Sequence, residues 1–235
     1  MSRRKKAFMK VTWLGQAGLL FDNGKTKIMI DPYLSNSVEK VNPKNFRRVS
    51  IKNEIFDIEP DIMIFTHDHL DHYDPETAPV FLGEGRKPMT VLCPNSVWQK
   101  ARQHGKEHNY VLFDRHTEWT ELGFRFIAVG AAHSDAYAIG VVIEDLLENK
   151  IYYVTGDTLY NSEIFSDIPD KIDVIFLPVN GVGNNMNVTD ALRFFKRCGA
   201  KKAVPYHVGM FDDLTSEIFD SKEKIMLEIY KEKEV

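Results

Sequence analysis

Short apolar runs separated by polar turns mark the first third of the chain. Three of them come first, at residues 11–14, 19–22 and 27–30. Asn23-Gly24 separates the second from the third, and this pair is typical of a tight hairpin because both residues tolerate a positive φ. A polar loop over residues 32–52 precedes another run at residues 61–65. The pattern predicts strands that are joined by a hairpin and by one long loop.

Helical and strand-like segments both occur in the rest of the chain. We predict helices over residues 75–82, from Asn95 to Gly105 and from about Thr189 to Gly199. Further strands are predicted over residues 90–93, 125–129, 137–144, 151–154, 173–179 and 202–206. An apolar stripe of helical spacing predicts a last helix over residues 214–231, with Ile218, Phe219, Ile225, Met226, Ile229 and Tyr230 on its buried face.

Two groups of strands with helices between and after them predict a layered α/β architecture. The sequence contains no Pro/Gly/Ser-rich linker and no repeat of fixed period. We therefore expect one domain over residues 9–235, preceded by a basic, mobile extension over residues 1–8.

Composition and charge narrow the class of protein. The chain has 235 residues, of which 43% are apolar, and its 30 basic and 34 acidic side chains give a net charge of −4. This composition is typical of a globular protein, and the acidic balance argues against a nucleic-acid partner. No apolar run approaches the roughly 18 residues of a membrane span, and Cys93 and Cys198 lie in apolar patterns typical of buried thiols. We expect a cytoplasmic protein that acts on a small molecule without a membrane partner, with a homo-oligomer left open.

The segment with the clearest chemistry is His67-Asp68-His69-Leu70-Asp71-His72, which directly follows an apolar strand. Imidazole nitrogens and carboxylate oxygens are ligands for divalent ions such as zinc, manganese and iron. His67 and His69 are two residues apart and can point the same way, while Asp71 and His72 follow on the next turn. This segment predicts a loop that binds two neighbouring ions.

Additional ligands are expected, because four side chains cannot fill two coordination spheres. His133, Asp157 and His207 each follow an apolar strand. Side chains at strand ends converge on one edge of the sheets in layered α/β proteins. We therefore expect these three residues to join the first cluster.

This ligand series resembles that of the metallo-β-lactamase superfamily of metal-dependent hydrolases. The resemblance rests on Thr66-His67-Asp68-His69-Leu70-Asp71-His72, then His133, then Gly156-Asp157-Thr158, then His207. It implies a four-layer αββα sandwich with two divalent ions, zinc or manganese, with iron as a further option. It also implies that one ion is held by His67, His69 and His133 and the other by Asp71, His72 and His207, with Asp157 between them.

Weaker motifs are similar to those of the L-ascorbate-6-phosphate lactonases within this superfamily. They are Trp13-Leu14-Gly15-Gln16-Ala17-Gly18, Ile30-Asp31-Pro32-Tyr33, Leu177-Pro178-Val179-Asn180-Gly181 and Asn185-Met186-Asn187. The lactonases of that branch are longer than this chain. The resemblance therefore supports the shared chemistry but not that particular sugar as the substrate.

Two cations that share a water molecule lower its pKa toward about 7 and polarise a carbonyl or phosphoryl oxygen. The predicted reaction is therefore hydrolysis, and we predict that Asp71 is catalytic because it lies next to the bridging position and can accept the proton of the water. Candidate substrate contacts are the basic side chains of one loop, Lys40, Lys44, Arg47 and Arg48, together with Asn180, Asn187 and Tyr206. For Asn187 helix capping is an equal alternative, and for Tyr206 simple packing is the alternative.

The substrate that we expect is a small phosphorylated or acidic metabolite, with lactone hydrolysis as the first choice. A phosphodiesterase, either a nuclease or a phospholipase-D-like enzyme, is the alternative among hydrolases, and the negative net charge argues against the nuclease. A di-iron oxidoreductase on the same scaffold and a metal-bound protein without turnover are the alternatives from other classes.

Overall fold

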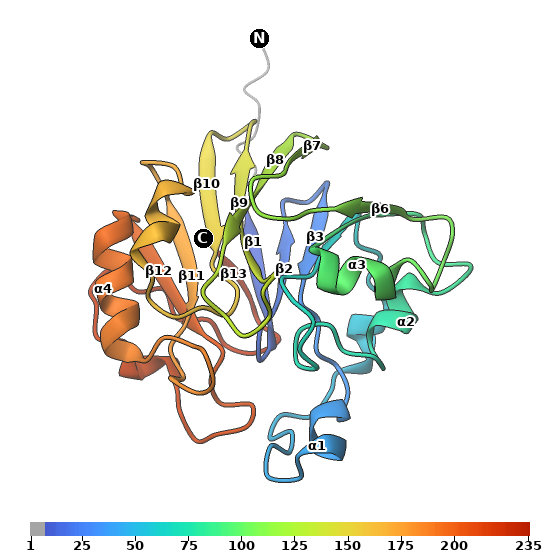
Figure 1. The fold of residues 1–235 in the computed structure, drawn as a ribbon, viewed down its shortest axis with the longest axis horizontal. Helices are drawn as coiled ribbons and strands as arrows, with labels where there is room; N and C mark the ends of the chain where they lie inside the picture. Colours follow the sequence, from blue (N-terminus) through green and yellow to red (C-terminus); the bar gives the residue numbers. More distant parts are fainter. Residues whose placement is uncertain (1–7) are drawn as a thin grey trace.

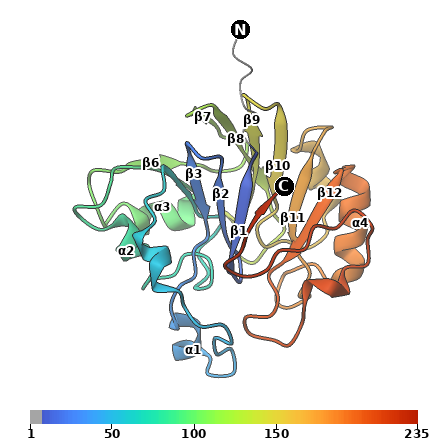
Figure 2. The same ribbon diagram turned by 180° about the vertical axis from the view of Figure 1, so that it is seen from behind.

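A computed structural model describes residues 8–235, in which two sheets pack face to face (Figures 1 and 2). The first sheet has seven strands in the spatial order β13-β1-β2-β3-β4-β5-β6. Their bounds are β1 (Lys10–Gly15), β2 (Gly18–Asp22), β3 (Lys27–Ile30), β4 (Ile62–Ile64), β5 (Thr90–Cys93), β6 (Asn109–Leu112) and β13 (Glu232–Glu234). The predicted basic extension, apart from Phe8, lies outside the described residues.

The second sheet has six strands in the spatial order β12-β11-β10-β9-β8-β7. Their bounds are β7 (Glu118–Glu121), β8 (Phe124–Gly130), β9 (Ile139–Asp145), β10 (Lys150–Val154), β11 (Val174–Pro178) and β12 (Lys202–Tyr206). In both sheets antiparallel pairs form one part, and parallel pairs from β3 to β6 and from β10 to β12 form the rest. Parallel neighbours bring several strand ends to the same edge, and this edge carries the candidate site.

Helices cover the outer faces of the two sheets. α2 (Ala78–Leu82) and α3 (Asn95–Ala101) lie beside the first sheet, and α4 (Val188–Cys198) lies beside the second (Figure 1). Short 3-10 turns occupy Asn53–Asp57, Ser162–Ser166 and Ser216–Ile218. The predicted αββα sandwich is therefore confirmed.

Two apolar clusters hold these layers together. The larger cluster includes Phe21, Tyr152 and Phe176 between the sheets, where the Phe21 ring lies 5.8 Å from Tyr152 and 5.1 Å from Phe176 between centroids. The smaller cluster packs Phe65 and Phe81 between the first sheet and its helices. The strands of the first sheet are therefore covered on both faces, which explains their nearly continuous apolar runs.

The predicted C-terminal helix is wrong. Beyond the 3-10 turn at Ser216–Ile218 the chain crosses from one sheet to the other. Ile225 N donates to Ala203 O of β12 at 2.7 Å, and Tyr230 N donates to Trp13 O of β1 at 2.7 Å. β13 then pairs antiparallel with β1. The apolar stripe is real, but edge strands offer unpaired backbone groups to this segment, and pairing with them replaces helical hydrogen bonds.

Two smaller predictions also need correction. The loop over residues 32–52 contains a short helix, α1 (Ser37–Val41), at whose ends Lys40 N donates to Asn36 O and Asn42 N donates to Val38 O. The N-cap of α3 is Pro94 in place of Asn95, and no side chain caps that helix. Cys93 and Cys198 are buried free thiols, as the apolar pattern indicated. Within residues 8–235, no helix has the length and apolar character needed to cross a bilayer.

Candidate metal centre

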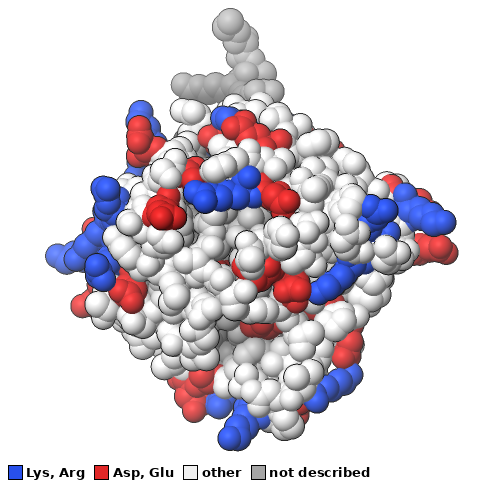
Figure 3. All heavy atoms as spheres, viewed as in Figure 1, with Lys and Arg blue, Asp and Glu red and all other residues white. Residues whose placement is uncertain are grey.

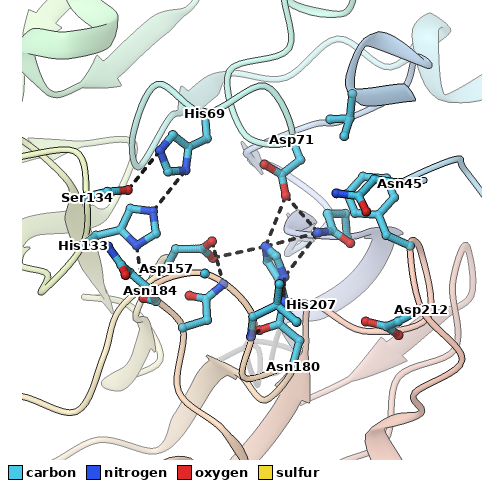
Figure 4. A pocket seen from close by; sticks show the side chains of 16 residues that line it. Asn45, His69, Asp71, His133, Ser134, Asp157, Asn180, Asn184, His207 and Asp212 are labelled. Atoms are coloured by element: carbon cyan, nitrogen blue, oxygen red, sulfur yellow. Dashed lines mark hydrogen bonds and ion pairs between the residues drawn. The ribbon is translucent and has the colours of Figure 1, made fainter. Parts of the chain in front are cut away.

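The ligand candidates gather where the strands end. β4 ends at Ile64 and leads into the loop that carries His67, while His133, Asp157 and His207 follow β8, β10 and β12. In Figure 4 the side chains of Asp157 and His207 point toward the same space as His69, His133 and Asp71. The convergence that the sequence predicted at this edge is present in the structure.

Seven side chains form three overlapping groups whose potential ligand atoms lie within 4.8 Å of one another. These groups are His67 with His69 and His133, Asp71 with His72 and His207, and His67 with His72 and Asp157. The first two groups match the two predicted sets of ligands, and the third places Asp157 beside both of them. The arrangement is therefore suited to two adjacent ions with one shared carboxylate.

The chemistry of these donors fits divalent metal ions. His72 Nε2 lies 3.2 Å from His207 Nε2, and both approach Asp157 Oδ1, at 3.3 and 3.2 Å. Among the described residues, buried Asp157 Oδ1 and His67 Nε2 have no hydrogen-bond partner. Buried polar atoms in proteins are normally satisfied, and cations between these nitrogens and oxygens would satisfy them.

The electrostatics favour cation binding as well. Burial, together with the nearby His72, holds the pKa of His67 well below its ordinary value, so its imidazole is neutral and keeps a lone pair for a metal. Burial opposes ionisation of Asp157, but His207 and His72 outweigh burial and hold the pKa of Asp157 well below its ordinary range. The His67 imidazole and the Asp157 carboxylate are therefore in the protonation states that metal coordination requires.

Asp31 is a site residue to which the sequence analysis gave no role. Its Oδ2 lies 2.8 Å from His72 Nδ1 and accepts the Thr66 hydroxyl at 2.6 Å, while its Oδ1 accepts Thr66 N at 2.8 Å. Burial lowers the pKa of His72, but Asp157 and Asp31 outweigh it and raise that pKa well above its ordinary value. Because the carboxylate accepts the Nδ1 proton, it directs His72 Nε2 toward Asp157, as outer carboxylates do for metal-binding histidines.

Amide side chains surround the ligands. Gln16 Nε2 donates to Asp71 Oδ2 at 2.9 Å, and Asn185 Nδ2 donates to Asp157 Oδ2 at 2.8 Å. His133 Nδ1 donates to the Asn184 carbonyl oxygen at 3.2 Å, which leaves its Nε2 facing His69. The sequence analysis named Gln16 only as part of a motif similar to those of the lactonases, whereas the structure places its amide in the site. These contacts fix the orientation of both carboxylates and of His133.

Three non-glycine residues of the site have a positive φ: Gln16 at 47°, Asp31 at 44° and His207 at 64°. This backbone region is unfavourable for residues with a Cβ and is common at functional sites. The side chains of all three reach the ligand cluster or its hydrogen-bond partners, so the strained backbone is what aims them.

Gly156 allows the backbone before Asp157 to approach its neighbours closely. Its φ is 60°, and a Cβ at this position would lie 2.6 Å from the Ile139 carbonyl oxygen. We expect Gly156→Ala to lower the free energy of unfolding by about 2 kcal/mol or more, since a left-handed alanine costs about 1–2 kcal/mol and the overlap adds to it. Urea denaturation measures this change.

Gly24→Ala is the matched control, because Gly24 also has a positive φ, 81°, but beyond its own and its two neighbouring residues no atom lies within 4 Å of the added carbon. Its cost should be the conformational one alone, about 1 kcal/mol. Equal losses in the two variants would contradict the close approach at Gly156.

A cavity of about 340 Å³ opens over the ligands. It is lined by Gln16, Val38, Asn45, His69, Asp71, His133, Ser134, Asp157, Asn180, Val182, Gly183, Asn184, Asn185, His207, Phe211 and Asp212. In Figure 3 a hollow in the lower centre of the face has acidic atoms at its floor and uncharged atoms over most of its border. The volume is that of a pocket for a small molecule.

The four basic side chains predicted as substrate contacts do not line this cavity. Lys40 forms an ion pair with Glu76 at 2.7 Å, and Arg48 pairs with Asp213. Lys44 is exposed on the loop. Arg47 donates to the carbonyl oxygens of Tyr33 and Val49, each at 2.9 Å, and to the Tyr230 hydroxyl at 3.1 Å. The guanidinium of Arg47 is thus committed to holding the loop in place.

The other three predicted contacts have different surroundings. Asn180 lines the cavity, and its Nδ2 lies 3.1 Å from His207 Nδ1. Asn187 is the N-cap of α4, where its Oδ1 accepts Asp190 N at 3.0 Å, so capping accounts for it. Tyr206 is fully buried and does not line the cavity, and burial raises its pKa well above the ordinary value. Of the three, the structure brings only Asn180 to the cavity.

Comparison with protein families gives one match that covers most of the chain. The family described as "Beta-lactamase superfamily domain" matches residues 26–208. Among similar proteins, a UPF0173 metal-dependent hydrolase of Oenococcus oeni is 27% identical over 231 residues, which is 89% of this chain and 90% of the relative.

Solved structures with the same fold have lower sequence identity. A possible metal-dependent hydrolase from Veillonella parvula superposes with a TM-score of 0.78 at 16% identity and covers 97% of this chain and 100% of its own. CmlA, a diiron β-hydroxylase from Streptomyces venezuelae, superposes with a TM-score of 0.76 at 13% identity, over 99% of this chain and 55% of its own. These likenesses agree with the sandwich of two sheets described above.

Proposed function

The chain belongs to the beta-lactamase superfamily domain family, and on this premise we propose that it is a hydrolase that uses two divalent metal ions. The observation that carries the proposal is the meeting of two ligand triads at Asp157. The printed description of the relative from Oenococcus oeni as a metal-dependent hydrolase supports the same reaction class.

Each of the seven ligand candidates has a role in the proposed hydrolase. His67, His69 and His133 would hold one ion, Asp71, His72 and His207 the other, and Asp157 both. When bound, such ions lower the pKa of water and polarise a carbonyl oxygen. Asp71 lines the cavity, and Gln16 holds one of its carboxylate oxygens, so Asp71 can orient a water molecule and accept its proton.

We expect purified protein to bind about two divalent ions per chain, with zinc or manganese as the proposed ions and iron as the further option. Elemental analysis after reconstitution and removal of excess metal measures the ratio. A value that never exceeds one ion per chain would contradict the shared role of Asp157. His67→Ala should lower the ratio, because its imidazole is a member of two of the three groups.

A lactone is the first substrate class to test, in line with the motifs that resemble lactonases. Hydrolysis of a lactone breaks the bond between the carbonyl carbon and the ring oxygen, and the water oxygen joins the carbonyl carbon. The metal-loaded protein should open lactones, and protein treated with a chelator should not. If the loaded protein hydrolyses phosphodiesters and leaves every lactone intact, the phosphodiesterase alternative replaces the lactonase.

A di-iron oxidoreductase is the rival from another class, and the likeness in fold to CmlA is the observation that favours it. Oxygen consumption by iron-loaded protein tests it. Hydrolysis supported equally by zinc, which cannot change its oxidation state, would exclude it.

A further inference from the structure

We infer that the substrate is uncharged away from its reacting carbonyl and carries an apolar group that lies against Val38, Val182 and Phe211. This inference rests on the proposed function, because it places the carbonyl at the ligands of the candidate metal centre. It also revises the expectation of a phosphorylated or acidic metabolite, since that expectation depended on the four basic side chains of one loop.

One wall of the cavity is apolar and firmly supported. Phe211 lines the cavity and packs against Tyr33, with 5.7 Å between ring centroids. Tyr33 is fully buried, and the Arg47 guanidinium lies over the Tyr33 ring, 5.1 Å from its centroid. Arg47 therefore supports this wall through Tyr33, in addition to holding the loop. A supported aromatic wall is suited to an apolar group of a ligand.

Aliphatic side chains extend the apolar surface. Val38 comes from α1 and Val182 from the loop before α4, so the two approach the cavity from different parts of the chain. Val182 is 62% exposed. Covering an exposed valine with an apolar ligand group removes apolar area from water and therefore favours binding.

Apart from the ligand candidates, the polar part of the lining consists mainly of amides. Asn45, Asn180, Asn184 and Asn185 surround the cavity, and Gln16 lies beside Asp71. An amide offers both donors and an acceptor without net charge. Such a lining can orient hydroxyl, amide or ester groups, but it does not neutralise an anion.

Charge within the cavity argues against an anionic tail. Among the described residues that line it there is no Lys or Arg. Asp212 adds a carboxylate on the side of Phe211, and its position is fixed because its Oδ1 accepts Gly209 N at 2.8 Å and Leu214 N at 2.9 Å. A phosphate or carboxylate placed against this wall would meet Asp212 with no Lys or Arg side chain in the lining to offset it.

The test compares two hydroxamates that bind to the metal-loaded full-length protein. Hexanohydroxamate carries a plain alkyl tail, and its matched partner carries a phosphate at the end of the same tail. Titration calorimetry gives both Kd values without any turnover. We expect the alkyl compound to bind about tenfold more tightly, because the charged phosphate keeps the end of the tail in water and so loses the burial of about two methylene groups.

Two variants link this preference to the cavity. Phe211→Ala should reduce the preference for the alkyl tail to about threefold or less, because it removes the aromatic wall. Asn45→Lys should tighten binding of the phosphate-tailed compound about tenfold relative to the alkyl compound, since it places a cation in the lining. Asn109→Lys is the control, because Asn109 begins β6 and does not line the cavity.

Wild-type binding of the phosphate-tailed compound that equals or exceeds that of the alkyl compound would overturn the inference, and so would failure of both compounds to bind. An alkyl preference that Asn45→Lys reverses and Asn109→Lys does not would support it. Failure of the proposed function has a different signature: the tail preference would persist while no lactone or ester is hydrolysed.

Discussion

Replacing Asp157 with Ala is expected to lower the metal content from two ions to one or fewer per chain and to reduce hydrolysis by more than about 100-fold. Removal of partners that only orient a ligand already costs about 10–100-fold, and Asp157 lies among the ligands themselves. It groups with His67 of one proposed ligand set and with His72 of the other, so its loss would leave both proposed ions without a shared carboxylate. Elemental analysis and a steady-state assay measure the two effects.

Asp68 and Asp74 give matched controls from the same loop region. Asp68 pairs with Lys100 at 2.7 Å on the surface, so Asp68→Ala should keep both ions and nearly full activity. Asp74 is buried, where it accepts the Thr77 hydroxyl and Glu76 N. Asp74→Ala should therefore lower the free energy of unfolding by about 1–3 kcal/mol and keep the metal ratio. Similar metal loss in all three variants would refute the assignment of Asp157.

Asp31→Asn should weaken metal binding by about 10–100-fold although Asp31 is not itself a ligand. Asparagine has a single acceptor oxygen, whereas both oxygens of Asp31 accept hydrogen bonds in the native site. An amide nitrogen would face either the backbone N–H of Thr66 or the Nδ1 proton of His72. In both orientations two donors oppose each other, and His72 loses the partner that directs its Nε2.

Asp61→Asn makes the same chemical change at the other end of β4. Asp61 Oδ2 accepts Lys27 N at 2.8 Å, and its other oxygen pairs with Lys87 at 2.7 Å, far along the strand from the ligands. Competition with a fluorescent zinc chelator would give the metal affinity of each variant. An unchanged affinity for Asp31→Asn, or an equal drop for Asp61→Asn, would show that Asp31 does not act through His72.

The seven ligand candidates were predictable from sequence because their residue types are costly to bury without a partner. Three histidines and two aspartates within residues 67–72 already indicate a metal site. His133, Asp157 and His207 followed from a rule of topology, since the ends of neighbouring strands meet at one edge. Hydrophobic runs likewise located most strands, because buried strands leave a local pattern.

Side-chain direction could not be predicted in the same way. Asp31 and Gln16 reach the site because their backbones adopt a positive φ. Neither residue type predicts that conformation from sequence. The loop with Lys40, Lys44, Arg47 and Arg48 shows that side chains evident in the sequence can also point away from the site. Its charges were visible in the sequence, but the structure commits Arg47 to Tyr33 and Tyr230, and Arg48 to Asp213.

The predicted helix over residues 214–231 was wrong for a third reason. Its apolar spacing fits a helix as well as it fits an extended segment with alternate contacts, and a local pattern does not reveal which sheet edges lack a neighbour. Ala203 of β12 and Trp13 of β1 supply those edges, and they lie far from this segment in sequence. Long-range pairing therefore overrode the local preference.

The pairing of β1 with β13 has a consequence for the order of folding during synthesis. Lys10 pairs with Glu234, so β1 is synthesised early but cannot pair with β13 until nearly the whole chain has been made. Until then the backbone groups on that side of β1 are open to pairing with another chain. His207 also emerges late, after the other six ligand candidates. A nascent chain therefore passes through a stage with an exposed sheet edge and an incomplete set of ligands, and such intermediates are prone to aggregate.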